Sequence, residues 1–246
     1  MSLAASIQIT DQDIYQQATV KGAANVGQVA TTPDGRTFAY SLAGAGGLVR
    51  GQITEPATVT ANYATRTIVT ASAAGANLVP VTLGTTATAD QFMGFWLVVT
   101  DTTAAGAGQG AYYIQGNTAA TAGNGNVTQL RIRGGLAVAL TTSSVVGIYP
   151  NQQSAVITHT ASAATPTSGA PVISVTAGNY FWNQVGGYAS ILSDGAVTKN
   201  ALALASASVA GAVTINLAAS VTQVVGFAPE LTVTGKYSPL VLTIGG

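Results

Sequence analysis

The chain has 246 residues with eight basic and eight acidic side chains, one histidine and no cysteine. Charged residues make up only 7% of it, against about 25% in an average soluble domain. So little charge cannot build the basic surface that nucleic acid or an anionic membrane requires, and the missing cysteines exclude disulfides, thiolate metal sites and a cysteine nucleophile. We therefore expect no nucleic-acid partner, no membrane partner and no cofactor. A neutral surface instead favours association with neighbouring subunits.

Residues 1–32 mix Gln, Asp, Ala and Gly without a sustained period. This pattern predicts an extended N-terminal arm that becomes ordered only where it docks. No secretory signal is visible at its start, so we expect the protein to be used inside the cell that makes it. Asp11 and Asp13 have the spacing of a metal motif, but no further carboxylate or His stands near them in sequence. A solvated turn is the favoured interpretation of this pair.

Residues 33–150 are predicted to form a first β subdomain. A turn signal, Pro33-Asp34-Gly35-Arg36, opens it. The glycine runs Gly44–Gly47 and Thr102–Gly110 lack the Lys-Ser/Thr and the helix of a phosphate loop, so we interpret them as a strand break and a hairpin loop. Strand-like segments follow at the intervals typical of sandwiches and barrels: Arg66–Thr70, Asn77–Leu83, Gly94–Thr100, Ala111–Gln115, Val127–Arg133 and Ser144–Tyr149.

Two features of this region are candidate contact sites. Phe95 and Trp96 lie in an almost continuous apolar run, Phe92–Thr100, which predicts a strand covered on both faces by a packed sheet or by another chain. Arg131 and Arg133 are two residues apart and would share one face of a strand. Exposed arginines most often serve solubility, whereas this pair is also a candidate clamp for a carboxylate of a neighbouring subunit.

Residues 151–246 are predicted to form a second β subdomain, or to continue the first. Its centre is residues 171–198, where we expect a central strand pair made of an alternating run at Val172–Thr176, an aromatic cluster and a turn at Asp194-Gly195. The aromatic cluster is Tyr180, Phe181 and Trp182. Phe181 or Trp182 should fill a core, with the following polar residues, Asn183 and Gln184, near a surface or a partner; plain core packing of the cluster is the alternative.

No catalytic constellation is visible. The single histidine, His159, has no GxSxG elbow and no set of metal ligands in the sequence, so a non-catalytic role is expected. No helix of more than two turns is encoded. The fold class predicted from these observations is all-β: an antiparallel sandwich or barrel, with two subdomains as an option and an N-terminal arm.

The order of motifs resembles the virion structural proteins of tailed bacteriophages. The resemblance rests on PDGRTFAYSLAGAGGLVRGQ, GQGAYYIQGNT, SAVITHT, AGNYFWNQVGGYASIL and YSPLVLTIGG, and it covers most of the chain from about residue 33. It implies a head decoration or cement protein on the capsid surface, assembled in the host cytoplasm. Its implied partners are the major capsid protein and further copies of the chain, often as a trimer. On this interpretation the N-terminal arm would dock as an added strand on a sheet edge.

Two other functions remain as alternatives. One is a tail, fibre or baseplate module in which exposed aromatic residues such as Tyr112, Tyr113 or Trp182 stack on glycans. The other is a glycan-cleaving enzyme, which requires two suitably placed carboxylates. The candidates for that pair are scattered beside turns, and turn or strand-end roles are favoured for them: Asp90, Asp101, Asp194 and Glu230.

Overall fold

The computed structural model describes residues 7–101, 110–162, 165–214 and 223–244. Strands dominate these residues, and the helical segments assigned among them are two three-residue 3-10 turns, η1 (Asp13–Tyr15) and η2 (Ala122–Asn124). The predicted all-β class is confirmed. The strands, in chain order, are β1 (Ile7–Gln8), β2 (Gln17–Ala18), β3 (Val29–Thr31), β4 (Thr37–Leu42), β5 (Thr54–Glu55), β6 (Arg66–Thr67), β7 (Leu78–Thr82), β8 (Trp96–Val99), β9 (Ala111–Asn117), β10 (Val127–Ile132), β11 (Val145–Tyr149), β12 (Ile157–Thr158), β13 (Ala170–Pro171), β14 (Tyr180–Leu192), β15 (Leu202–Ala205), β16 (Val213–Thr214), β17 (Val224–Phe227) and β18 (Tyr237–Thr243).

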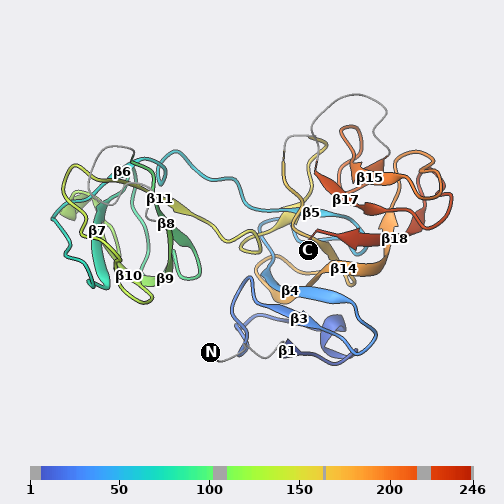
Figure 1. The fold of residues 1–246 in the computed structure, drawn as a ribbon, viewed down its shortest axis with the longest axis horizontal. Coiled ribbons are helices and arrows are strands. Elements are labelled where there is room, and N and C mark those ends of the chain that lie inside the picture. Colours follow the sequence, from blue (N-terminus) through green and yellow to red (C-terminus); the bar gives the residue numbers. More distant parts are fainter. Residues whose placement is uncertain (1–6, 102–109, 163–164, 215–222, 245–246) are drawn as a thin grey trace. The chain divides into compact units, whose positions relative to one another are not determined.

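The chain forms two compact units, drawn in Figure 1. Unit 1 comprises Met1–Ala57 and Gln152–Gly246, and unit 2 comprises Thr58–Asn151. The division predicted from the sequence is 1–32, 33–150 and 151–246, whereas these units divide the chain after Ala57 and after Asn151. Residues before 58 belong with the C-terminal part because β4 pairs with β14, a contact between segments far apart in sequence that local pattern does not encode.

Unit 1 is built on a ten-stranded sheet in which β14 is central. The first half of β14 pairs with β4 and the second half with β18, both antiparallel. The expected pair of strands in residues 171–198 is thus one 13-residue strand. Residues 172–176 form no strand beyond an isolated bridge between Val175 and Leu48. The strand predicted from this alternating run is therefore wrong, and the one bridge of the run joins it to a distant segment.

The described part of the N-terminal arm is docked on this sheet. β1 pairs with β3, and β3 pairs with β4. Ile14 and Phe38 are fully buried in one hydrophobic cluster, which explains why the segment folds back. Residues 7–32 are therefore part of unit 1. The arm was expected to be ordered only where it docks, and these residues dock on their own chain because their few apolar side chains find partners on β4.

Unit 2 is a six-stranded barrel. Its strands follow the order β6-β11-β8-β9-β10-β7, and the bridge between Ile68 and Val81 brings the two ends of this order together. The six strand-like segments predicted between residues 66 and 149 are its six strands. The loop at 102–109, predicted as a hairpin, lies outside the described residues.

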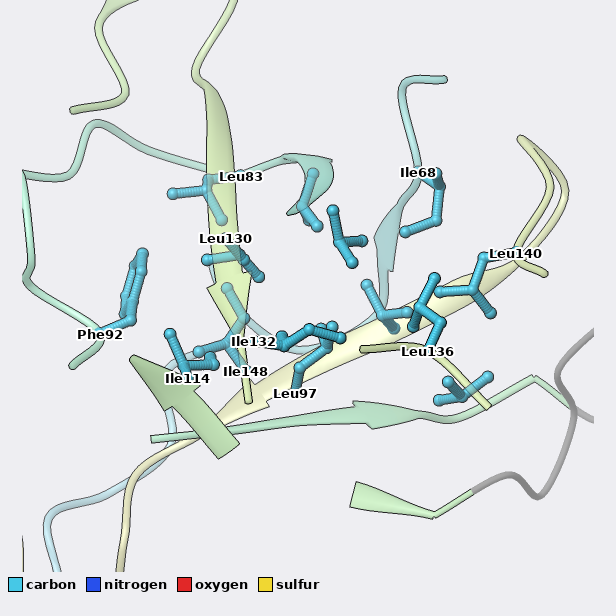
Figure 2. Close-up of a cluster of buried hydrophobic side chains, with 14 of the residues drawn as sticks. Ile68, Leu83, Phe92, Leu97, Ile114, Leu130, Ile132, Leu136, Leu140 and Ile148 are labelled. Carbon is cyan, nitrogen blue, oxygen red and sulfur yellow. The ribbon is translucent and has the colours of Figure 1, made fainter. Parts of the chain in front are cut away.

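The interior of the barrel is filled by aliphatic side chains and Phe92. Figure 2 shows that they come from opposing strands and point toward one another. Closure pairs the two ends of the sheet through the Ile68–Val81 bridge and lets inward positions be buried, which is how strands of two to seven residues form a stable unit. Among the described residues, no helix has the length and apolarity needed to cross a membrane.

Candidate functional site

The aromatic cluster of β14 lies inside unit 1. Phe181 is 1% exposed and Trp182 9%, and the half-buried Tyr180 stacks on Tyr40 with ring centroids 5.8 Å apart. The expectation that Phe181 or Trp182 fills a core is confirmed for both. All three of these contact candidates line a cavity of about 490 Å³ on unit 1, together with Tyr40.

The polar residues after this cluster are buried as well, contrary to expectation. Asn183 donates from Nδ2 to Thr54 Oγ1 (3.0 Å), and Gln184 donates from Nε2 to the carbonyl oxygens of Gly186 (3.1 Å) and Tyr188 (2.8 Å). Both side chains are almost fully buried, and these hydrogen bonds offset the cost of burying amides.

Of the two aromatic candidates in unit 2, one points inward and one outward. Phe95 packs against the barrel core, with its ring 5.9 Å from that of Phe92. Trp96 is on the outer face and is 36% exposed. The same alternation separates Tyr112, which packs against the core, from Tyr113, which contacts Trp96 edge to face with ring centroids 5.5 Å apart.

Four neighbouring strands continue this contact into a row across the outside of the barrel. Tyr149 of β11 is opposite Trp96 of β8, which is opposite Tyr113 of β9. The amide of Arg133 donates to the Tyr113 carbonyl (2.9 Å), which places Arg133 at the other end of the row. Arg131 lies one outward position away on β10. We call these five residues the barrel strip.

The two arginines have the common orientation that their spacing predicts. Arg131 and Arg133 are exposed, whereas Leu130 and Ile132 between and beside them are buried. Arg131 is opposite Gly116, where an added Cβ would lie 3.1 Å from its Nη2. The barrel strip therefore joins two exposed guanidinium groups to three aromatic rings on one face.

Unit 1 carries a second surface of similar chemistry. A cavity of about 410 Å³ lies beside the second half of β14. Three of its lining tyrosines are well exposed: Tyr15 (58%), Tyr188 (64%) and Tyr237 (50%). Arg36 and Arg50 also line it, and no carboxylate does. We call these five residues the tyrosine–arginine groove.

At two glycines with positive φ, side chains of this groove pack directly against the backbone. Gly51 has φ +70°, and an added Cβ would lie 2.7 Å from the Tyr237 ring. Gly187 has φ +81°, and an added Cβ would lie 3.1 Å from Arg36 Cγ. Both positions thus combine a left-handed conformation with a close approach that a larger residue would obstruct.

The two arginines of the groove differ in their electrostatic surroundings. Arg36 donates from Nε to Asp34 Oδ2 (2.6 Å), and its Nη2 lies 3.5 Å from Asp11 Oδ1. The hydroxyl of Thr32, the amide of Arg36 and the Arg36 guanidinium, in that order of effect, lower the pKa of Asp34 to about 2. Arg50 is exposed, and its guanidinium forms no ion pair or hydrogen bond with the described residues. The groove therefore has one unbalanced positive charge.

Asp11 and Asp13 lie in the turn that was expected for them. Asp13 Oδ2 accepts hydrogen bonds from the amide and the hydroxyl of Thr10, at 2.8 and 2.7 Å, and these bonds lower its pKa. Asp11 faces Arg36 instead. The two carboxylates therefore have separate partners.

His159 lies in a buried polar cluster with Glu55. Its Nε2 is 3.8 Å from Glu55 Oε2 and 3.2 Å from the Thr165 hydroxyl, and its side chain has no exposed surface. Glu55 also accepts hydrogen bonds from the amide of Thr160 (3.0 Å) and the hydroxyl of Thr165 (2.7 Å). The cluster joins segments 105 residues apart. Its burial keeps it from a dissolved substrate.

The remaining carboxylates are divided between the two units. Asp90 and Asp101 are in unit 2, and Asp194 and Glu230 are in unit 1. Asp90 accepts the Asn117 amide (3.3 Å), and Asp194 accepts the Ser206 hydroxyl. Across the residues that the structure describes, no group of three or more His, Cys, Asp and Glu side chains is arranged to hold a metal ion.

The groove residues escaped sequence reasoning because they come from five separate segments. Arg36 was noted only as part of a turn, and Tyr15, Arg50, Tyr188 and Tyr237 stood out in no local pattern. The barrel strip was partly visible, since Trp96, Arg131 and Arg133 were candidates. Tyr149 was missed because its neighbour Trp96 is 53 positions away in the chain.

Comparison of the chain with family models, with curated proteins and with solved structures found no match.

Proposed function

We propose that the chain is a non-enzymatic structural protein of a tailed-phage virion, which decorates the head by binding major capsid protein subunits through the barrel strip. The observation that carries the proposal is the row of Trp96, Tyr113 and Tyr149 ending at Arg133 on an exposed face of unit 2. Tryptophan, tyrosine and arginine are the residues that contribute most to binding at protein interfaces.

Rigidity supports this role for the strip. Tyr149, Trp96, Tyr113 and Arg131 stand on paired strands of a barrel whose interior is packed, so the backbone that carries them is already ordered when a partner binds. Tyr149 is further restrained because its ring lies over Gly147, where an added Cβ would be 2.5 Å away. A preorganised aromatic surface of this kind suits a subunit that must bind many equivalent positions on a shell.

The charge of the chain supports docking by burial of apolar surface. With eight positive and eight negative side chains, the protein has no net field to steer it toward an anionic partner. Arg131 and Arg133 would supply local specificity by pairing with a capsid carboxylate. Binding only to the assembled shell then stabilises that shell.

The homo-oligomeric contact is proposed for a different face, on unit 1. Leu202 of β15 and Phe227 of β17 are directly opposite each other and are exposed at 59% and 38%. We take this apolar pair as part of a surface that another protein covers. A second copy of the chain is the proposed occupant, with the trimer as the favoured assembly.

The test uses purified heads assembled without this protein and the full-length chain. Wild-type protein should cosediment with the heads, and Trp96→Ala should weaken binding by about 2 kcal/mol, or about thirtyfold, the effect of losing an interface hot spot. Arg133→Ala should weaken binding less and should reduce discrimination between shells with and without the facing carboxylate.

The matched controls are Tyr188→Ala and Arg50→Ala, which remove an exposed aromatic residue and an exposed arginine from unit 1. Both variants should bind heads as the wild type does. Equal loss in all four variants, or wild-type binding to tails and none to heads, would reject the assignment of the barrel strip as a head-docking surface.

A further inference from the structure

We infer that the tyrosine–arginine groove of unit 1 is a binding site for a carboxylate-bearing saccharide. The groove is separate from the barrel strip, and the inference does not rest on the proposed function. Its cavity of about 410 Å³ falls in the range of small-ligand sites, about 300 to 1,000 Å³. The chemistry of its lining identifies the class of ligand.

The charge of the groove calls for an anionic group. Arg50 is exposed without an ion-pair partner among the described residues, and the lining includes no carboxylate. The charge of Arg36 is already balanced by Asp34. Arg36 therefore contributes to the shape of the groove and offers a hydrogen-bond donor, but adds little net charge. A guanidinium presents its donors in a planar fork that matches a carboxylate, and Arg50 has this fork free.

The three tyrosines call for a flat ligand with both apolar faces and hydroxyl groups. A tyrosine ring offers an apolar face for the C–H side of a pyranose ring and a hydroxyl that exchanges hydrogen bonds with sugar hydroxyls. Tyr237 is held in place over the backbone of Gly51, and Tyr188 is fixed to the central strand of the sheet. The Tyr237 ring, restricted in this way, loses little entropy on binding.

An extended peptide is a poorer fit, although β14 has an unpaired stretch here. β4 leaves β14 at Gly186, and the next backbone partner on this edge is Gly51, whose carbonyl accepts the Leu192 amide (2.9 Å). Strand addition would need the free carbonyls between them.

Those carbonyls are not available to an incoming strand. The Tyr188 carbonyl already accepts Gln184 Nε2 (2.8 Å). The Ser190 carbonyl faces Gly51 so closely that an added Cβ there would be 2.7 Å from it. A ligand in the groove is therefore recognised by side chains and not by strand pairing. This favours a saccharide over a peptide strand.

The experiment is calorimetric titration of the full-length protein with two acidic probes, a galacturonic acid trimer and sialyllactose. Their neutral counterparts are the carboxyl-reduced trimer and lactose. At least one acidic probe should bind at least about tenfold more tightly than its neutral counterpart, the effect of one charge-assisted contact. Arg50→Ala should abolish this preference, and Tyr188→Ala should weaken the acidic and the neutral sugar together.

Arg133→Ala is the matched control, because it removes an exposed arginine from unit 2 and should leave saccharide binding unchanged. Arg50 makes no side-chain hydrogen bond with the described residues, so its loss should leave the fold intact. Arg50→Lys keeps the charge without the fork and should recover only part of the preference.

The inference is overturned if neither acidic probe binds, if acidic and neutral sugars bind equally, or if Arg50→Ala behaves like Arg133→Ala. A tetraglutamate peptide that binds as tightly as the sugars, with the same dependence on Arg50 and Tyr188, would identify an acidic-peptide site and would also overturn it. Head binding is tested through Trp96 and saccharide binding through Arg50 and Tyr188. A negative result in one experiment therefore leaves the other proposal untouched.

Discussion

Single residues in this protein show how a charge-poor chain uses the few charges it has. Glu55 is 3% exposed, yet its oxygens accept hydrogen bonds from Thr160 and Thr165 and face His159. Asp34 closes the turn after β3 by bonding Thr32 and Arg36. In both cases one carboxylate accepts hydrogen bonds from several donors. These bonds offset the free-energy cost of burying Glu55 and of ordering Asp34.

Asp34 provides a prediction about pH. Its folded pKa is about 2, below the value of about 3.9 for an unperturbed Asp, so its contribution to stability is complete above the unfolded pKa and is lost as the pH falls toward 2. Asp34→Asn should lower the urea midpoint at pH 6, and its difference from wild type should shrink between pH 4 and pH 2.

The control for this measurement is Glu230→Gln, which removes an exposed carboxylate that accepts no hydrogen bond from the described residues. Its midpoint difference should stay small across the same range. A difference for Asp34→Asn that is as large at pH 2.5 as at pH 6 would show that the carboxylate charge does not stabilise the turn.

At the scale of elements, β14 organises unit 1. Its side chains supply Phe181 and Trp182 to two hydrophobic clusters, and Ile191 to a third. Its outer face presents Tyr188 to the groove, while its neighbours extend the sheet toward the exposed apolar pair on β15 and β17. One strand therefore connects the core of the unit to both of its proposed binding surfaces.

The proposed self-contact at Leu202 of β15 and Phe227 of β17 can be tested through the oligomeric state. Phe227→Ser removes the larger exposed apolar side chain from the proposed self-contact. It should lower the mass measured by light scattering from about three chains toward the 24.4 kDa of one chain. The Phe227 side chain points to solvent from the last position of β17. Its loss should therefore change the urea midpoint of the monomer little.

Val20→Ser is the matched control, since Val20 is a more exposed apolar residue in an irregular segment. It should leave the mass as in the wild type. A wild-type protein that is monomeric at all concentrations, or a Phe227→Ser variant that remains oligomeric, would contradict the assignment of this face.

At the scale of the whole molecule, the chain is an insertion of one unit into another. Unit 2, Thr58–Asn151, has its own closed sheet and its own core of sixteen buried residues. Unit 1 is completed only when the segments on both sides of this insertion have been made, because β4 pairs with β14. Unit 2 is therefore made from one continuous segment, whereas unit 1 requires pairing between segments far apart in the chain.

This difference predicts that residues 58–151 fold when expressed alone. The fragment should show one cooperative urea transition with a slope of about 1 kcal/mol per molar, because the core cluster and the six paired strands of the barrel all lie within residues 58–151. The companion fragment 152–246 lacks β4 and should remain unfolded. A fragment 58–151 without dispersed amide signals in NMR would contradict the independence of unit 2.

The sequence by itself determined the all-β class, the six strands of unit 2 and the burial of Phe181 and Trp182, because alternation and turn chemistry are local properties. It also determined that Arg131 and Arg133 share a face. Only the tertiary structure decided that residues 7–57 belong with residues 152–246 and that Asn183 and Gln184 are buried. It alone brought Tyr15, Arg50, Tyr188 and Tyr237 into one groove. These outcomes depend on pairing between strands far apart in the chain, whose partners and register no local pattern specifies.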